Sequence, residues 1–345
     1  MKKYLILFIA ACQGLTTLAQ DNKTPYLTKS LSNAGIKNVY VSTSGGSISV
    51  SGASGEEPRI EVYVSGNNGL SNLSKDEIKK RLEENYTLDI TTSGGELKAI
   101  AKNKHDHNWD WRRSLNIGFK VYVPQNVATK LETSGGSIHL DNLSGQEVFE
   151  TSGGSLHIDK LTGNIRGRTS GGSITLMNSK DNIDLETSGG SIRASNCSGN
   201  IHLETSGGSI RLEDLSGKIG AETSGGSVGA NNIKGELKTG TSGGSINLTN
   251  LACSLDTYTS GGSIHAQLKE ASKFVKIDAS GGHVDLELPS KQGFDLNLRA
   301  DKVTAELGGG SFNGTKEKDR IEGKLNGGGI SVDVNGSNRV NLTLN

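Results

Sequence analysis

The sequence repeats one phrase, Thr-Ser-Gly-Gly, at a nearly fixed interval. Copies begin at Thr43, Thr92, Thr133, Thr151, Thr169, Thr187, Thr205, Thr223, Thr241 and Thr259. From Thr133 to Thr259 every step is 18 residues, and degenerate copies follow at Ala279 and Asn326. A short fixed period indicates a stacked array, in which each unit buries its apolar face only against its neighbours.

One unit, residues 200–217, shows the expected local structure. Ile201 and Leu203 alternate with polar residues, which predicts a strand with one buried face. The Ser-Gly-Gly that follows is expected to form a corner with positive φ, where a side chain on Gly207 has no room. From Ile210 onward apolar and polar residues alternate again, which predicts a second strand.

Equivalent positions of the units favour a parallel solenoid over an antiparallel meander. The column after each glycine pair is apolar: Ile138, Leu156, Ile174, Ile192, Ile210, Val228, Ile246 and Ile264. A corner column holds Asn142, Asn178, Asn196, Asp214, Asn232 and Asn250, interrupted by Lys160, and Asn tolerates the left-handed conformation. In-register stacking places like residues on top of one another. We therefore predict an all-β fold, a parallel β-solenoid (β-helix) with 18-residue coils and an N-terminal capping region that contains one short helix.

The glycine pairs of the repeat are interpreted as structural turns. They are Gly135, Gly136, Gly153, Gly154, Gly171, Gly172, Gly189, Gly190, Gly207, Gly208, Gly225, Gly226, Gly243, Gly244, Gly261 and Gly262. A phosphate loop needs a following Lys-Ser or Lys-Thr and a helix, and the sequence offers neither. A nucleophile elbow needs Gly two residues on either side of Ser, on a turn from a strand to a helix, and the repeat does not provide this arrangement. No catalytic residue is assigned.

The N-terminus, residues 1–19, is predicted to be a signal peptide. Lys2 and Lys3 precede a short apolar core. Cleavage after Ala19 competes with a lipobox-like site that would make Cys12 a lipidated residue. Either outcome predicts export to the periplasm, the outer membrane surface or the extracellular space, with membrane attachment only if Cys12 is lipidated.

The rest of the chain divides into three predicted segments. Residues 37–132 should form irregular coils and a cap, with a helix inserted at about 74–85. Residues 133–278 should form the regular repeat solenoid. Residues 279–345 should form degenerate coils and a C-terminal cap, and within them the short strands of residues 311–345 should close the end of the stack.

The inserted helix is predicted from its capping residues. Ser74 is placed as the N-cap and Glu77 at the third helical position, with Leu73 and Ile78 as a hydrophobic staple. A helix at the first coil would cover an edge that otherwise invites aggregation.

The charge balance argues against a protein that binds nucleic acid or an anionic membrane, and the cysteine spacing argues against a disulfide. Lys+Arg and Asp+Glu both number 37, so no overall field attracts nucleic acid or an anionic membrane. Cys197 and Cys253 fall three coils apart, roughly 14 Å at strand spacing, which is too far for a disulfide. No cofactor and no metal site is assigned.

Candidate ligand-binding residues gather in one loop, at His105, His107, Trp109 and Trp111. Both tryptophans of the chain lie there and could stack on a sugar or a peptide, whereas two alternate His residues are a weak metal signal. Two other exposed features are a His139–His157 ladder and an acidic stripe broken by Arg168, made of Glu132, Glu150, Glu186, Glu204 and Glu222. Stacked like charges are unfavourable, so the stripe should require screening or attract cations.

The strand Phe119–Pro124, of the form Phe-x-Val-x-Val-Pro, together with the exported start and the Thr-Ser-Gly-Gly-Ser-Ile units, resembles the bacterial putative adhesin family, domain of unknown function 4097. The likeness extends over residues 37–335. It implies a β-helical exported protein without catalytic residues to carry over.

These features lead to a non-enzymatic exported β-solenoid as the functional hypothesis. It would be an adhesin-like surface or periplasmic binding or scaffold protein, with a glycan or a protein as its surface partner and no nucleic acid. The alternatives are a carbohydrate-binding or carbohydrate-cleaving β-helix, and an envelope-stress or assembly protein. The oligomeric state stays open.

Overall fold

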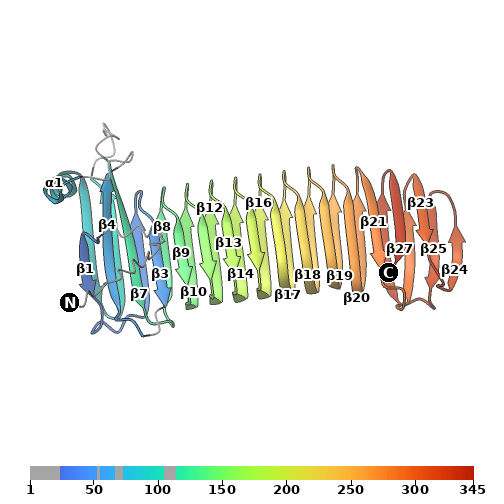
Figure 1. Cartoon of the computed structure of the whole chain (residues 1–345), viewed down its shortest axis with the longest axis horizontal. Coiled ribbons are helices and arrows are strands. Elements are labelled where there is room, and N and C mark those ends of the chain that lie inside the picture. The colour runs from blue at the N-terminus through green and yellow to red at the C-terminus, as the bar shows by residue number, and fades with distance from the viewer. Residues whose placement is uncertain (1–23, 53–54, 67–72, 105–113) are drawn as a thin grey trace, which may run out of the picture.

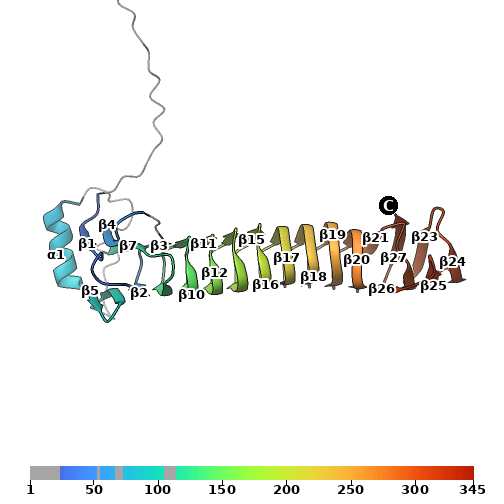
Figure 2. The same ribbon diagram turned by 90° about the horizontal axis from the view of Figure 1, so that it is seen from below.

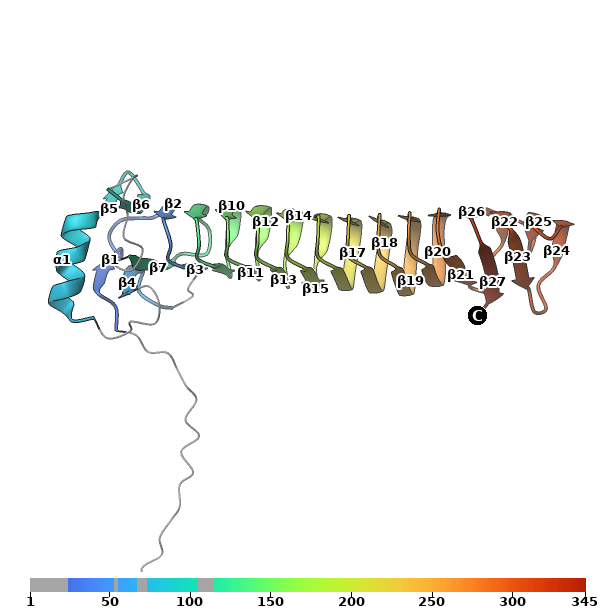
Figure 3. The ribbon, with the colours of Figure 1, turned by 90° about the horizontal axis from the view of Figure 1, so that it is seen from above.

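The computed structural model describes residues 24–52, 55–66, 73–104 and 114–345. These residues form a long, largely parallel, solenoid-like stack of β-strands with one short helix at its N-terminal end (Figure 1). Seen from above and below, the strands lie in two layers that face each other across the core (Figures 2 and 3). We call them layer A and layer B. The predicted signal peptide and the His105–Trp111 loop lie outside the described residues.

Layer A begins at the N-terminal end. In spatial order it holds β5 (Tyr86–Ser93), β6 (Glu96–Asn103), β2 (Asn38–Thr43), β8 (Ala128–Thr133), β10 (Ser144–Thr151), β12 (Thr162–Thr169), β14 (Lys180–Thr187) and β16 (Ser198–Thr205). Only the β5–β6 pair is antiparallel in this set.

Layer B runs alongside. It holds β1 (Leu27–Ser30), β4 (Arg59–Gly66), β7 (Leu115–Val123), β3 (Ile48–Gly52), β9 (Ile138–Asp141), β11 (Leu156–Asp159), β13 (Ile174–Met177) and β15 (Ile192–Ser195). The strands β17 (Ile210–Thr223), β18 (Val228–Thr241), β19 (Ile246–Thr259) and β20 (Ile264–Ala279) then run through both layers. The sheets therefore continue without a break along the repeat.

Pairing within the repeat is parallel and in register. Thr151 pairs with Thr169, and Thr169 with Thr187, so the same position of successive units stacks. The predicted apolar column is buried, with Ile138 and Leu156 fully inaccessible. This confirms that like residues stack along the axis and that the core is a continuous apolar seam between the layers.

The corner between the layers follows the predicted asparagine column. Asn142, Asn178, Asn196, Asp214, Asn232 and Asn250 have φ between 51° and 57°, and Lys160 shares the conformation at 53°. Asn and Asp adopt this left-handed region more readily than other non-glycine residues. The prediction for this corner is confirmed, and Lys160 is the residue that departs from the preferred types.

The reason expected for the glycine pairs is wrong. None of the repeat pairs from Gly135 to Gly262 has a positive φ, and in the degenerate copy that follows only Gly282 has one. The expected lack of room is real, but it falls on the second glycine of the pair, Gly208, and the expectation for Gly207 is wrong. A Cβ on Gly208 would lie 2.1 Å from the carbonyl oxygen of Gly190 in the preceding unit, whereas a Cβ on Gly207 would meet its nearest neighbour at an ordinary 3.5 Å.

The threonine of the phrase explains why that carbonyl is so close. The Thr205 hydroxyl donates to the Gly190 carbonyl oxygen at 2.7 Å and accepts from the Gly208 backbone N–H at 3.3 Å. Thr205 is buried, and the same pair of bonds recurs at the other repeat threonines. One hydroxyl therefore closes its own bend and joins it to the preceding unit.

One copy of the phrase is not part of the repeat. Thr92-Ser93-Gly94-Gly95 connects the antiparallel strands β5 and β6 as a hairpin. Gly94 and Gly95 have φ of 57° and 80°, as a two-residue hairpin turn with two left-handed residues requires. The inclusion of Thr92 among the stacked copies is therefore wrong, because antiparallel pairing reverses the chain at that point.

The predicted helix is confirmed as α1 (Lys75–Asn85), which lies across the N-terminal end of the stack (Figure 2). The Ser74 hydroxyl accepts from the Glu77 backbone N–H at 3.2 Å. Leu82 is buried, while Leu73 and Ile78 pack partly buried against the core. Within the described part of the chain no helix is long and apolar enough to span a membrane.

Both ends of the stack are built by strands inserted out of sequence order. At the N-terminal end, β2 lies between β6 and β8, and β3 between β7 and β9. At the other end, β26 (Ile330–Gly336) lies between β20 and β22 (Phe294–Arg299), and β27 (Arg339–Leu344) lies between β21 (His283–Leu288) and β23 (Lys302–Glu306).

Only the first part of residues 311–345, which were expected to close the C-terminal end, does so. The antiparallel hairpin of β24 (Phe312–Lys316) and β25 (Arg320–Leu325) lies outermost, because β25 pairs with β22. The final strands β26 and β27 instead join the outer strands to the regular repeat. Each inserted strand therefore has a hydrogen-bonded neighbour on both sides and leaves no open edge.

Both described cysteines are free and buried. Cys253 lies beside Gly235 of the preceding unit, and burial raises the pKa of its thiol to about 12. Burial also raises the pKa of the Cys197 thiol, and the absence of a disulfide between the two agrees with the sequence analysis. These thiols serve as small core side chains.

One core position holds an acid. Glu147 is fully inaccessible. It pairs with Thr129 on one neighbouring strand and with Ile165 on the other, and further along the stack the residues of this column are apolar. The Thr129 hydroxyl donates to Glu147 Oε2, while Oε1 has no hydrogen-bond partner among the described residues. Burial raises the pKa of this carboxyl to about 7.

The glycine geometry predicts different costs at two adjacent positions. Gly208→Ala should destabilise by about 3 kcal/mol or more, because the backbone of two units must separate to admit the methyl group. Gly207→Ala should change stability by less than about 0.5 kcal/mol. Urea unfolding followed by circular dichroism compares the two variants, and equal midpoints would contradict the assignment.

Glu147 predicts a pH dependence of stability. Because the folded-state pKa of about 7 exceeds the usual 4.5, folding favours the protonated acid. Its contribution is full below pH 4.5, declines as the pH rises to 7 and then stays constant, a loss of about 3 kcal/mol. Glu147→Leu should remove this decline in pH-dependent unfolding, whereas the exposed Glu150→Gln should retain it. A decline of the same size in Glu147→Leu would refute the assignment.

Candidate functional site

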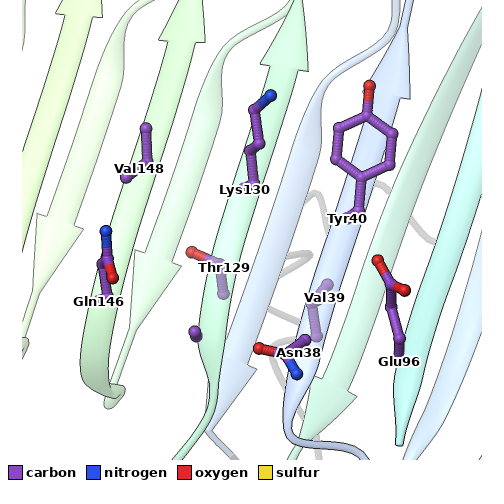
Figure 4. Close-up of a pocket in the computed structure, with 9 residues that line it drawn as sticks. Asn38, Val39, Tyr40, Glu96, Thr129, Lys130, Gln146 and Val148 are labelled. Atoms are coloured by element: carbon purple, nitrogen blue, oxygen red, sulfur yellow. The ribbon is translucent and has the colours of Figure 1, made fainter. Parts of the chain in front are cut away.

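The outward side chains of layer A line a shallow polar trough, which we call the layer A groove. Its N-terminal part is a hollow of about 580 Å³ over β6, β2, β8 and β10 (Figure 4). Asn38, Tyr40, Glu96, Thr129, Lys130, Gln146 and Val148 line it. A second hollow of about 560 Å³ shares Gln146 and Val148 and continues over β12, β14 and β16. The two form one trough that crosses the strands.

A ladder of side-chain amides follows the groove. Gln146, Asn164, Asn182 and Asn200 occupy the same position on successive strands and are exposed. The Asn182 amide nitrogen donates to Asn164 Oδ1 at 3.0 Å. Stacked amides leave donors and acceptors on their outer side, so the ladder offers a regular set of hydrogen bonds to an extended ligand.

Tyr40 stands at the N-terminal end of the groove (Figure 4). Its hydroxyl donates to Glu132 at 3.1 Å, and the Lys130 ammonium lies 5.5 Å from its ring centroid and 3.0 Å from Glu132. These contacts hold the phenol ring in place, half-buried, two strands away from Gln146, the first amide of the ladder.

The charges of layer A are neutralised within the layer. Arg166 pairs with Asp184 at 3.2 Å and Arg168 with Glu186 at 3.3 Å, each across neighbouring units. Lys238 pairs with Glu222 at 3.1 Å in the same manner. Three members of the acidic stripe expected to require screening, Glu132, Glu186 and Glu222, therefore receive counter-charges from adjacent lysine and arginine side chains.

Layer B carries a different surface. His139 and His157 stack with ring centroids 4.5 Å apart and planes 6° from parallel. Burial, and secondarily the neighbouring His157, lower the pKa of His139, although the residue is exposed on the outer face of layer B. Lys160 lies 3.8 Å from Asp141 and 3.2 Å from Asp159. The described residues contain no group of three or more His, Cys, Asp or Glu placed to hold a metal.

A cluster of charged and aromatic side chains lies on β4 and β7, at the N-terminal end of layer B. It was not identified from the sequence. Glu61 accepts from Arg59 at 2.7 Å and from the Tyr63 hydroxyl at 2.7 Å. The Arg59 guanidinium lies 3.8 Å from the Tyr122 ring centroid, and Lys120 lies 4.8 Å from that of Tyr63. A hollow of about 910 Å³ opens beside Tyr63 and extends toward His139. Antiparallel pairing of two distant segments builds this cluster, so no local motif reveals it.

The residues predicted to bind a ligand are not placed by the structure. His105, His107, Trp109 and Trp111 lie outside the described residues, as does Cys12. The glycine pairs from Gly135 to Gly262 lie in bends at the junction of the layers and contribute no side chain. The site that the structure does bring together is the layer A groove, whose amide ladder was visible in the sequence only as polar strand positions.

Comparison with known proteins gives two matches. A solved structure described as a putative cell adhesion protein from Clostridium sporogenes has 10% sequence identity, covering 92% of this chain and 98% of that chain, with a TM-score of 0.19. No curated protein matches the sequence.

The family comparison concerns the C-terminal half of the stack. The model described as Toastrack DUF4097 matches residues 178–339, which run from the Asn178 corner through the inserted strand β26. This match confirms the resemblance noted in the sequence for that part of the chain. Residues 178–339 are therefore similar to the toastrack domain that the DUF4097 model describes.

Proposed function

We propose that this chain is a non-enzymatic, exported β-solenoid of 18-residue coils that acts as an adhesin-like binding or scaffold protein. The spacing of 18 residues between hydrogen-bonded serines, such as Ser137 and Ser155, supports the coil length. Export rests on the positively charged and apolar start of the sequence. The description of a distant structural relative as a cell adhesion protein agrees with this role.

The layer A groove is the proposed binding surface, and a neutral glycan is its proposed ligand. The amide ladder carries this proposal, since its donors and acceptors recur once per unit along about 14 Å from Gln146 to Asn200 at strand spacing. Tyr40 adds an aromatic face at one end. Because the ion pairs of layer A are internally satisfied, an uncharged polymer fits it better than a polyion.

The proposal excludes carbohydrate cleavage. The carboxyl whose pKa is raised to about 7 is Glu147, and it is buried beneath the groove rather than open to a glycosidic bond. Glycoside hydrolysis requires two carboxyl groups that flank the scissile bond. The exposed carboxylates Asp184 and Glu186 instead hold arginines of the neighbouring unit.

A glycan array of neutral oligosaccharides tests the groove. The mature chain should bind at least one extended oligosaccharide, and the double variant Asn164→Ala/Asn182→Ala should weaken that binding tenfold or more by loss of the ladder. Asn247→Ala, an exposed amide on layer B, is the matched control and should bind like wild type.

Three results would refute parts of this function. Absence of binding to every neutral oligosaccharide would reject the ligand class, and equal losses in Asn247→Ala and the double variant would reject the groove. Release of reducing sugar from a bound oligosaccharide by wild-type protein would reject the non-enzymatic role and favour a carbohydrate-cleaving protein.

A further inference from the structure

A row of basic side chains, interrupted by Thr175, crosses layer B, the layer opposite the groove, and Arg193 and Arg211 are its cations. His139 pairs with His157, His157 with Thr175, Thr175 with Arg193 and Arg193 with Arg211, each on the next strand. Both arginines and both histidines are exposed. From His139 to Arg211 the row is about 19 Å long at strand spacing.

The two arginines differ from those of layer A in having no counter-charge. Neither Arg193 nor Arg211 forms an ion pair within the described part of the chain, whereas Arg166 and Arg168 each hold a carboxylate. Like charges directly opposite one another on paired strands repel. An anionic ligand that lies between Arg193 and Arg211 would remove this repulsion and gain two charge-assisted contacts.

A row of serine hydroxyls runs beside the cations. The oxygens of Ser155, Ser173, Ser191 and Ser209 each accept a backbone N–H from the next unit, with N–O distances of 3.2 to 3.3 Å. These hydroxyls donate to no group among the described residues, so their protons are free to point outward. We call the two rows together the donor face, because each member offers a hydrogen-bond donor to solvent.

The flanking residues limit what this face can accept. On the other side of the cations lie Asp141 and Asp159, both held by Lys160, and Glu213. A duplex nucleic acid carries one charge per about 1.7 Å, far denser than the two arginine charges that this row of about 19 Å supplies. The net charge of the whole chain is +0, so no long-range field favours such a polyanion.

We propose that the donor face binds a linear acidic polysaccharide, with carboxylates on Arg193 and Arg211 and sugar oxygens on the serine row. A polysaccharide with at most one carboxylate per sugar has the sparser charge that two neighbouring arginines match. The Tyr63 ring and its hollow lie on the same layer beyond His139 and offer a surface of mixed polar and aromatic character, which includes Lys120, for the ligand's continuation. This site is separate from the layer A groove and does not depend on it.

Fluorescence anisotropy with labelled oligogalacturonate tests the proposal. Wild-type protein should bind it, and raising the salt concentration should weaken binding. The double variant Arg193→Gln/Arg211→Gln should bind at least tenfold more weakly. Arg166→Gln/Arg168→Gln is the matched control on layer A, and it should stay within twofold of wild type. Circular dichroism checks that both double variants fold.

Four results would overturn the proposal. They are absence of oligogalacturonate binding by wild type, equal losses in the two double variants, binding of the methyl-esterified oligosaccharide as tight as that of the acid, and tighter binding of single-stranded DNA of equal length. A failure of the neutral-glycan array would leave these outcomes unchanged, because that assay reports on Asn164 and Asn182 of the other layer.

Discussion

The contact between the Gly208 position and the Gly190 carbonyl determines how the stack is built. The carbonyl is held by the Thr205 hydroxyl, which also binds the Gly208 N–H and so locks one bend onto the bend before it. No side chain fits at Gly208 while this contact persists. Repeated in each unit, the contact keeps parallel strands in register, and the apolar column behind it is buried as a consequence.

With the corners and the core fixed, the two outer faces are free to differ. Layer A combines amides with ion pairs that are satisfied between neighbouring units, while layer B leaves Arg193 and Arg211 unpaired beside outward-facing serine hydroxyls. The same backbone therefore presents one nearly neutral surface and one anion-accepting surface. This division of charge is the reason that the two proposed ligands, one neutral and one acidic, are assigned to opposite layers.

Much of the regular repeat could be predicted from the sequence, because in-register stacking turns a column of letters into a column of side chains. The buried Ile210 column and the left-handed Asn196 column follow directly. The role of Gly208 could not be predicted from the sequence, since a glycine required for space and a glycine required for positive φ look alike in a sequence. The Gly94 copy shows the converse, where the same letters form a hairpin.

The ends and the faces depend on contacts between distant segments, which a local pattern does not contain. Strand β26 enters the stack between β20 and β22, and the Glu61–Tyr63–Lys120 cluster requires antiparallel pairing of β4 with β7. Likewise, a glutamate at position 147 looks like any polar strand residue until the register places it beneath the groove, on the buried side.

The direct test of this account is the stability of Thr205→Val compared with Thr205→Ser in urea unfolding. Valine keeps the shape of threonine but leaves the Gly190 carbonyl and the Gly208 N–H without their partner, so the variant should lose about 1–3 kcal/mol. Serine keeps the hydroxyl and should lose less than valine does. A Thr205→Val protein as stable as wild type would contradict the claim that this hydroxyl joins successive units.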